Sequence, residues 1–504
     1  MGVWIKRGIA AFLILWALLV LAVVAFISFG PVSSPAAVFN ALFGFGTASP
    51  DQATMEQRLS VPDGFSIGQY ASGLKKVRMM EFSRTGDLVV SQPREGKVLL
   101  LQRDSNEDGR HDGSKVLLDK LTRPHGLEFH EDWLYIAESN AVGRVLFDHK
   151  TGELAGSYER IVTGLTDNGN HWSKSIRIRD GYLYVSMGST CNVCIEKDER
   201  RATIMRFDVD GQNGEIFASG LRNSVGMDFA PWDGSLYATD NGRDLLGDDY
   251  PVCELNKIER NTFYGWPFIN GFGDLDPDLG EGRESLLDYA VPPAFGFRPH
   301  NAPLGIRFIR QAKMPAGYDN SALVALHGSW NRSTPDGYKV VSLHWTPDGK
   351  IHSQDFMTGF ESDGSIIGRP VDIAEGPDQC LYISDDYSGT IYRVCYGKEQ
   401  NTLDDSSQTP LEDPQWDALS AAEIEESHKQ GEAIYALNAC ASCHLLNGEG
   451  NPSGKKLQQL HRRYTLDTLT AYFLSPNPPM PQYDLSETQR HDLAVYLLSQ
   501  DSDN

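Results

Sequence analysis

The sequence predicts a mainly β protein, in which a six-bladed β-propeller is preceded by an apolar transmembrane helix and followed by a small all-α domain. Three observations predict this order. Residues 9–29 contain no charge, strand-like segments recur about every 50 residues between 60 and 397, and helical periodicity begins near residue 420. A chain of 504 residues exceeds one ordinary core, so a large domain with smaller additions fits its length.

The N-terminal segment 1–30 is expected to target the chain to a membrane. The uncharged stretch 9–29 is long enough to cross the hydrocarbon core of a bilayer, and Lys6 and Arg7 before it should stay cytoplasmic. Small residues further on, around Ala48, would permit cleavage, so a retained anchor and a cleaved signal are both open. In either case we expect the soluble domains to face the periplasm, held at the bacterial cytoplasmic membrane or released from it.

The composition excludes one class of partner. The net charge is -23, from 45 basic and 68 acidic residues, so phosphate backbones would be repelled and no nucleic acid is expected as a partner. Hydrophobic residues make up 40% of the chain and accompany 48 Gly and 26 Pro, which is typical of a turn-rich globular protein.

The segment 60–397 repeats one pattern, after a linker at 31–59. A turn with Gly or Asp leads into an apolar strand, and a second strand often follows, as in "TGDLVVSQPREGKVLLLQR" and "PDQCLYISDDYSGTIYRVC". The first leucines of the repeated strands are Leu88, Leu134, Leu183, Leu236, Leu323 and Leu381. Repeats of this length with several short strands each are typical of propeller blades, and six repeats predict six blades.

A longer insertion interrupts the repeats between about Asn261 and Pro303. It is rich in Gly, Pro and aromatic residues, and we expect long loops over one face of the propeller. Loops on a rigid scaffold often carry a binding site, although aromatic residues such as Trp266 and Phe272 could equally serve to pack the loops themselves.

Five of the seven cysteines lie in the propeller segment. Cys380 and Cys395 flank a predicted hairpin, so they could form a disulfide across two strands. Cys191 and Cys194 could ligate a metal, but no second pair lies at zinc spacing, and a local disulfide or two structural thiols fits better. Cys253 has no evident partner.

A small α domain at 420–504 follows a polar linker at 398–419. Its sequence "CASCH" matches C-x-x-C-H, in which two thiols bind the haem vinyl groups and the adjacent histidine binds the iron. The sequence therefore predicts a covalent haem c on Cys440 and Cys443, with His444 as an axial ligand of the iron.

The sixth ligand of the haem iron is assigned to Met480. It lies in the Pro-rich segment "SPNPPMPQY", which can present a thioether to the open face of the iron and raise the haem potential. His461 and His491 are alternative ligands, and packing is the alternative role for Met480. Residues 420–502 resemble the small monohaem cytochrome c fold, which implies that this domain transfers single electrons.

The propeller segment carries neither G-x-G-x-x-G after a strand nor a P-loop, which disfavours nicotinamide and flavin sites of the Rossmann type. Its candidate groups lie in turns before strands: His171 in "GNHWSKS", and Arg222 and Asn223 in "GLRNSVG". An acidic turn, "TDNGRDLLGDDY", could hold a hard cation. Each group has a simpler role as a turn residue, a surface ion pair or a solvated loop, but their equivalent positions in successive blades favour a shared site.

These motifs, together with "GSTCNVC", "YGWP", "HGSWNRS" and "GRPVDI", resemble the quinoprotein glucose/sorbosone dehydrogenases, and most closely the L-sorbosone dehydrogenase-like branch. The resemblance covers residues 60–397. It implies a six-bladed propeller that binds PQQ with calcium and oxidises a sugar or a related aldehyde.

The resemblance also implies roles for individual residues. His171 would be the general base that takes the proton of the substrate hydroxyl. Arg222 and Asn223 would stabilise the charge that develops on the PQQ oxygens. Arg332 and Arg369 would pair with PQQ carboxylates, for which a planar guanidinium is well shaped.

Calcium, by the same resemblance, would be bound by the backbone carbonyls of Gly242 and Arg243, with Asp240 nearby, and would polarise the quinone as a Lewis acid. The chain departs from the family pattern in two places. Arg243 replaces a proline typical of soluble glucose dehydrogenases, and His125, also assigned to the cofactor, stands where an amide is expected.

The sequence thus predicts a PQQ-dependent sugar or aldehyde dehydrogenase that passes electrons through its own haem c to a downstream respiratory acceptor. Two alternatives stay open: a metal-dependent lactonase-like propeller, and a propeller that binds a ligand without PQQ and uses the haem as a sensor or relay. The first predicts ring opening without haem reduction, and the second predicts no bound quinone.

Overall fold

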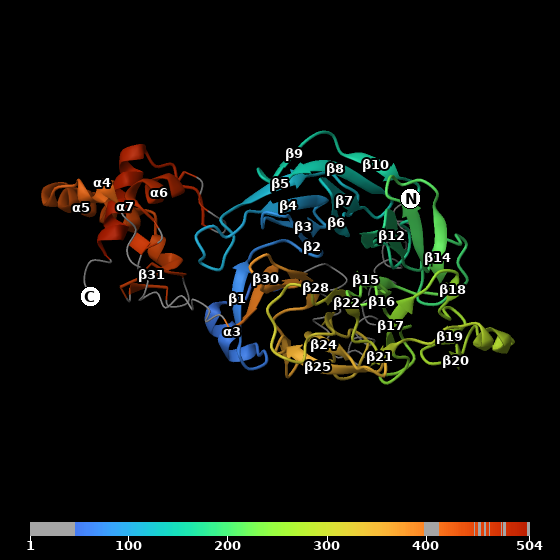
Figure 1. The fold of residues 1–504 in the computed structure, drawn as a ribbon. Helices are drawn as coiled ribbons and strands as arrows, with labels where there is room; N and C mark the ends of the chain where they lie inside the picture. The colour runs from blue at the N-terminus through green and yellow to red at the C-terminus, as the bar shows by residue number, and fades with distance from the viewer. Residues whose placement is uncertain are drawn as a thin grey trace, which may run out of the picture. The chain divides into compact units, whose positions relative to one another are not determined.

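The computed structural model describes residues 46–397, 413–447, 449–451, 455–457, 460–462, 464–474, 476 and 480–500. They divide into two compact units at residue 400, a ring of antiparallel sheets and a helical domain (Figure 1). The predicted N-terminal helix lies outside the described residues, as do parts of both predicted linkers. No helix in the described ranges is long and apolar enough to cross a bilayer. The predicted domain boundaries stay predictions.

The first three blades are built from consecutive antiparallel strands. The first contains β2 (Met80–Phe82), β3 (Leu88–Gln92), β4 (Lys97–Leu101) and β5 (Ser114–Leu118). The second contains β6 (Leu127–His130), β7 (Trp133–Ala137), β8 (Val142–Asp148) and β10 (Glu159–Val162), with β9 (Glu153–Leu154) paired to β8. The third contains β11 (Ile176–Arg179), β12 (Tyr182–Met187), β13 (Thr203–Asp208) and β14 (Glu215–Ser219).

The last three blades complete the ring. The fourth contains β15 (Ser224–Phe229), β16 (Leu236–Asp240), β17 (Cys253–Ile258) and β21 (Phe295–Phe297). The fifth contains β22 (Pro303–Phe308), β23 (Ser321–Leu326), β24 (Lys339–Trp345) and β25 (Ile351–Met357). The sixth contains β28 (Pro370–Glu375), β29 (Leu381–Asp385), β30 (Thr390–Tyr396) and the early strand β1 (Phe65–Ala71). Because β1 pairs with β30, with Ser66 opposite Cys395, the two ends of the propeller segment close the last blade.

The predicted six-bladed propeller is confirmed, and the repeated leucines explain why it could be predicted. All six lie on the second strand of a blade, namely on β3, β7, β12, β16, β23 and β29, and all are buried. These strands lie between two neighbours in their sheet, and they read as apolar runs because both of their faces are covered.

The insertion at 261–303 supplies strands as well as loops. Besides β21 in the fourth blade, it contains β18 (Thr262–Phe263), which pairs in parallel with β14 of the third blade. The hairpin of β19 (Ile269–Asn270) and β20 (Asp274–Leu275) and a short 3-10 helix at Glu284–Asp288 complete it. Two further small elements lie elsewhere in this unit: helix α3 (Gln52–Arg58), and the hairpin of β26 (Glu361–Ser362) and β27 (Ser365–Ile366).

The helical unit packs two long helices against each other. Its elements are α4 (Pro414–Asp417), α5 (Ala421–Leu437), η2 (Cys440–Ser442), β31 (His444–Leu446), β32 (Glu449–Gly450), β33 (Lys455–Lys456), η3 (Leu460–Arg462), α6 (Leu466–Tyr472) and α7 (Glu487–Ser499). A Cβ at Gly431 of α5 would lie 2.2 Å from the carbonyl oxygen of Asp492 on α7. A glycine is therefore required where the two helices cross.

Two disulfides lie in the propeller. Cys380 and Cys395 are joined across β29 and β30, as the predicted hairpin suggested, and Cys191 and Cys194 form the local disulfide that was one of two predicted states. Cys253 is a buried free thiol, whose sulfur accepts a hydrogen bond from the amide of Gly242 at 3.5 Å.

Candidate active site

A cavity of about 280 Å³ opens at one face of the ring. Its wall combines residues just before the first strand of a blade with residues just after the second strand, because antiparallel neighbours bring these two points together. Its charged lining residues are Lys76, Arg78, Arg94, Arg369 and Asp386. Four cationic side chains against one carboxylate favour an anionic ligand.

Three of the residues predicted for the cofactor and substrate line this cavity. His171 precedes β11 of the third blade, Asn223 immediately precedes β15 of the fourth, and Arg369 immediately precedes β28 of the sixth. The repeat therefore brings together side chains that lie up to 198 positions apart (369 minus 171) in the sequence.

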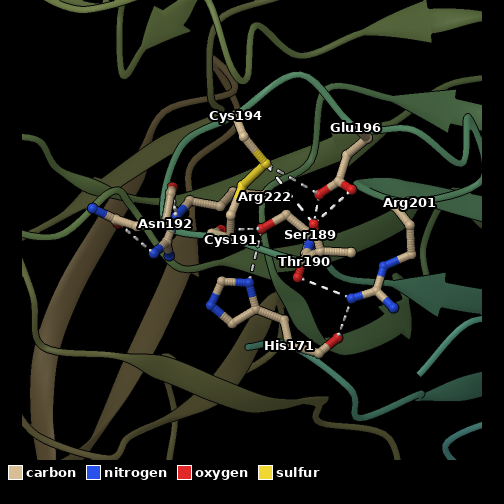
Figure 2. Close-up of a disulfide and its surroundings, with 9 residues drawn as sticks. All are labelled: His171, Ser189, Thr190, Cys191, Asn192, Cys194, Glu196, Arg201 and Arg222. Carbon is tan, nitrogen blue, oxygen red and sulfur yellow. Dashed lines mark hydrogen bonds between the residues drawn. A yellow bond between two sulfur atoms is a disulfide. The ribbon is translucent and has the colours of Figure 1, made fainter. Parts of the chain in front are cut away.

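The imidazole of His171 is held by the loop that follows β12 (Figure 2). Its Nδ1 atom lies 2.8 Å from Oγ of Ser189, and its backbone carbonyl accepts a hydrogen bond from Arg201 at 3.1 Å. Burial, followed by the nearby cations of Arg222 and Arg201, lowers the pKa of His171 well below 6.5. The ring is therefore uncharged at neutral pH and can accept a proton.

Arg222 itself is turned away from the cavity lining. It is buried, and its guanidinium donates to the side-chain oxygen of Asn192 at 2.8 Å and to Asp244 at 3.0 Å. The neighbouring residue Asn223 is anchored through its backbone, because its amide donates to Asp240 at 2.5 Å. Of this predicted pair, Asn223 lines the cavity. Arg222 does not line it, but its charge lowers the pKa of His171 in the cavity wall.

Asp386 links Arg78 to His327 in the wall of the cavity. It pairs with Arg78 at 2.7 Å and accepts a hydrogen bond from Nε2 of His327 at 2.9 Å. Burial opposes ionisation of this carboxyl, but His327 and Arg78 together hold its pKa well below 3.8. Arg369 donates to the backbone carbonyls of His327 and Gly328 at 3.0 and 2.8 Å, which fixes its guanidinium at the cavity wall.

His125 and Arg332 lie outside the lining that the described residues form. His125 is completely buried, and burial, followed by the charge of Arg78, lowers its pKa to about 3. Its Nδ1 atom lies 3.3 Å from the carbonyl of Lys174, and its Nε2 atom has no hydrogen-bond partner in the described part of the chain. Arg332 is buried against the carbonyls of Asp248 and Pro299. Its predicted contact with a PQQ carboxylate stays a prediction.

The residues predicted to bind calcium line a second, much smaller hollow of about 20 Å³. Asp240, Gly242 and Arg243 share it with Glu254, which lies opposite Asp240 in the pairing of β16 and β17. Burial raises the pKa of Asp240 to about 7 and that of Glu254 to about 8. The carboxylates of the buried Asp240 and the half-buried Glu254 at one hollow suit a hard cation. The side chain of Arg243 is paired with Asp276 at 2.5 Å.

Two of the residues predicted to hold the haem lie against one apolar cluster of the helical unit. Cys440 and Met480 both pack against it, and neither Cys440 nor Cys443 is in a disulfide. After α5 the chain turns at Ala439, whose φ of 50° is left-handed, and this turn leads directly into the C-x-x-C-H segment that ends at His444. The residues thus fit a covalently bound haem at this cluster.

Sequence reasoning missed several residues of the cavity, among them Arg78, Trp172 and Asp386. Arg78 stands two positions before β2, as His125 stands before β6 and Lys174 before β11, but neither His125 nor Lys174 lines the cavity. Position relative to the first strand therefore does not by itself select the lining residues.

Fold and site together define a six-bladed propeller with a cationic cavity at its mouth, joined in one chain to a cytochrome c domain. The TrAA12-like family model matches residues 59–263 and 287–396, so the chain belongs to the TrAA12-like family. The cytochrome c family model matches residues 428–501, which confirms the predicted identity of the helical unit.

The chain is also similar to individual proteins over about two thirds of its length. A protein of Borreliella burgdorferi without an assigned activity is 30% identical over 363 residues, which are 68% of this chain and 91% of that protein. A pyrroloquinoline quinone-dependent pyranose dehydrogenase of Coprinopsis cinerea is 26% identical over 67% of this chain, and the match spans 54% of the relative's own length. The calcium structure of the Trichoderma reesei Carbohydrate-Active Enzymes Family AA12 protein matches 67% of this chain and 97% of that one, with a TM-score of 0.59 at 22% identity. The predicted likeness to PQQ-dependent sugar dehydrogenases is confirmed.

Proposed function

We propose that the chain is an exported PQQ-dependent dehydrogenase that oxidises a sugar or a related aldehyde and passes the electrons to its own haem c and on to a respiratory acceptor. The observation that carries this proposal is the cavity at the mouth of the ring. It combines the uncharged imidazole of His171 with the cationic side chains of Arg78 and Arg369. A base beside a cationic pocket suits proton removal next to an anionic cofactor.

The lining of the cavity suits PQQ in charge and includes an aromatic ring. PQQ is a flat tricyclic quinone that carries carboxylates, and the guanidinium and ammonium groups of the lining outnumber the carboxylate of Asp386. Trp172 adds a flat aromatic wall, and the guanidinium of Arg123 lies 4.8 Å from its ring centroid. When bound, PQQ supplies an oxidant that takes two electrons from the substrate.

The residues of the chain contribute orientation and proton transfer. The imidazole of His171 is uncharged and can accept the proton of the substrate hydroxyl. The side chain of Asn223 faces the same cavity and supplies an amide there for hydrogen bonding to the bound groups. Both side chains precede first strands of the ring, so the rigid sheets fix their separation.

Calcium would be held by the backbone carbonyls of Gly242 and Arg243, with the carboxylates of Asp240 and Glu254 at the same small hollow. A site made of oxygen atoms suits this cation. The Trichoderma reesei relative is described as a calcium structure, which supports the same metal here.

The haem and the location of the protein complete the proposal. Haem c would be attached to Cys440 and Cys443, with His444 and Met480 as axial ligands of the iron. The two disulfides of the propeller suit an oxidising compartment. We therefore propose that residues 1–30 act as a membrane anchor or a cleaved signal at the bacterial cytoplasmic membrane, and that the soluble domains face the periplasm.

The test uses the full-length, haem-containing protein with and without added PQQ and calcium. Aldoses, other pyranoses and aldehydes are added anaerobically, and the absorbance of ferrous haem is followed. We expect haem reduction only when PQQ is bound, and a rate about 10³-fold lower in the His171→Gln variant because the base is lost. If no sugar or aldehyde reduces the haem, the proposal fails. Calcium-dependent ring opening of a lactone without haem reduction would instead support the hydrolytic alternative.

A further inference from the structure

A disulfide-closed loop packs directly against the candidate base. The segment after β12 contains Ser189, whose side chain is completely buried, and the Cys191–Cys194 disulfide closes the loop two residues later (Figure 2). Two groups lie within hydrogen-bond distance of Oγ of Ser189: a ring nitrogen, which can donate or accept, and a carbonyl oxygen, which can only accept. Oγ lies 2.8 Å from Nδ1 of His171 and 2.7 Å from the backbone carbonyl oxygen of Cys191.

The number of hydrogens at this point decides the direction of both hydrogen bonds. A serine hydroxyl carries one hydrogen, and a carbonyl oxygen can only accept. The hydroxyl of Ser189 must therefore donate to the carbonyl of Cys191, because the reverse arrangement would bring two acceptors together at 2.7 Å. Its lone pair then accepts from His171, so the hydrogen of the neutral ring lies on Nδ1.

We propose that Ser189 is a positioning residue that fixes His171 in the Nδ1–H tautomer and leaves Nε2 as the proton acceptor for the substrate. The tautomer follows from the hydrogen bonds alone, whereas the role of Nε2 as proton acceptor rests on the proposed function. In the step itself the substrate O–H bond breaks, an N–H bond forms at Nε2, and the electron pair of the O–H bond stays on the substrate oxygen. Without the serine hydroxyl, either ring nitrogen could carry the hydrogen.

Hydrogen bonds from Arg201, Arg222 and Asp244 hold the loop around Ser189 in place. Arg201 donates to the carbonyl oxygens of both His171 and Ser189, at 3.1 and 2.9 Å. Asn192 lies between the two cysteines of the disulfide. Its side-chain oxygen accepts hydrogen bonds from Arg222 and from the backbone amide of Asp244, each at 2.8 Å. The carbonyl that orients Ser189 is thus part of a fixed frame, which is what a group that selects a tautomer requires.

The adjacent residue Thr190 offers a matched control. Its hydroxyl donates to Glu196 at 2.8 Å and makes no contact with the imidazole. Thr190→Val removes this hydroxyl from the same loop with almost no change in shape. A general disturbance of the loop would appear in this variant, whereas the tautomer effect should be confined to Ser189.

The first experiment measures the tautomer without any turnover. The full-length protein is labelled with 15N-histidine, and the ring signals of His171 are assigned by their loss in His171→Gln. We expect a protonated Nδ1 and an unprotonated Nε2 at neutral pH in the wild type and in Thr190→Val, and a shifted or averaged pattern in Ser189→Ala. A protonated Nε2 in the wild type, or an unchanged pattern in Ser189→Ala, would overturn the proposal.

The second experiment follows haem reduction by substrate in the PQQ-loaded protein. Ser189→Ala should lower kcat by about 10²-fold with KM changed less than about threefold, because the base and not the binding is affected. Ser189→Thr, which keeps the hydroxyl, should recover most of this loss, and Thr190→Val should stay close to wild type. Equal rates for Ser189→Ala and the wild type overturn the proposal. If the wild type itself reduces no haem, the proposed function fails, while the NMR result still decides the tautomer.

Discussion

Arg78 and Asp386 form an ion pair of 2.7 Å between the first and the sixth blade. Arg78 stands before the first strand of its blade, and Asp386 follows the second strand of its own, so the pair lies where the ring closes. Both side chains also line the central cavity. The same contact therefore joins the ends of the propeller and shapes its candidate active site.

The Asp386→Asn substitution should destabilise the propeller by about 2 kcal/mol at neutral pH, because it removes the partner of the guanidinium of Arg78, whose side chain is only 19% exposed. The pKa of Asp386 is depressed in the folded state, so its contribution is present above the ordinary carboxyl value of 3.8 and is lost as the pH falls through its folded pKa. Denaturant unfolding at neutral and acidic pH measures both effects. The exposed pair of Arg84 and Asp132 is the control, and Asp132→Asn should cost less than about 1 kcal/mol. A loss for Asp386→Asn no larger than that for the control would contradict the assignment.

The Arg222→Gln substitution should move the acid limb of the pH profile upward. Burial and the charge of Arg222 lower the pKa of His171, so removal of this cation raises the pKa and protonates the base at a higher pH. The pH dependence of kcat/KM reports this change in the free enzyme. Arg260→Gln, which breaks an exposed ion pair with Glu215, should leave the limb in place. An acid limb that does not move in Arg222→Gln would show that His171 is not the titrating base.

The Gly188→Ala substitution should impair catalysis more than folding. A Cβ at this position would lie 2.6 Å from Cβ of His171 and 2.9 Å from the side-chain oxygen of Asn223, so both groups must move. A displacement of this size should lower kcat by about 10²-fold. Gly73→Ala is the control, since it introduces strain at a φ of 70° but meets no atom within 4 Å. It should cost about 1 kcal/mol of stability and leave kcat unchanged. Wild-type kcat in Gly188→Ala would be incompatible with a fixed His171.

The Met480→Leu substitution should lower the reduction potential of the haem, because a thioether ligand raises it. The open coordination position should also bind added imidazole far more tightly than in the wild type. A redox titration and an imidazole titration measure the two effects. His461→Gln and His491→Gln should change neither, and a change confined to one of them would identify that histidine as the ligand.

The blade count could be predicted because the six second strands all carry a buried leucine within their first three residues. The outer strand β21 of the fourth blade was missed, because "FGF" is short, contains glycine and lies in a Pro-rich segment that resembles a loop. In the site, His171 and Asn223 were predictable from their place before first strands. The orientation of Arg222 was not, since it depends on Asn192, thirty positions away, and on the disulfide loop that contains it.

The most direct test of the central claim is an electron count in the full-length protein loaded with PQQ and calcium. A limiting amount of an oxidisable sugar is added anaerobically, with no external acceptor, and the ferrous haem formed is measured. Because the oxidation releases two electrons and each chain carries one haem, we predict one haem reduced by its own propeller per sugar molecule, a second only as the remaining electron passes to the haem of another molecule, and none in protein without PQQ. Sugar oxidation that leaves the haem oxidised, or haem reduction that is independent of PQQ, would contradict the account.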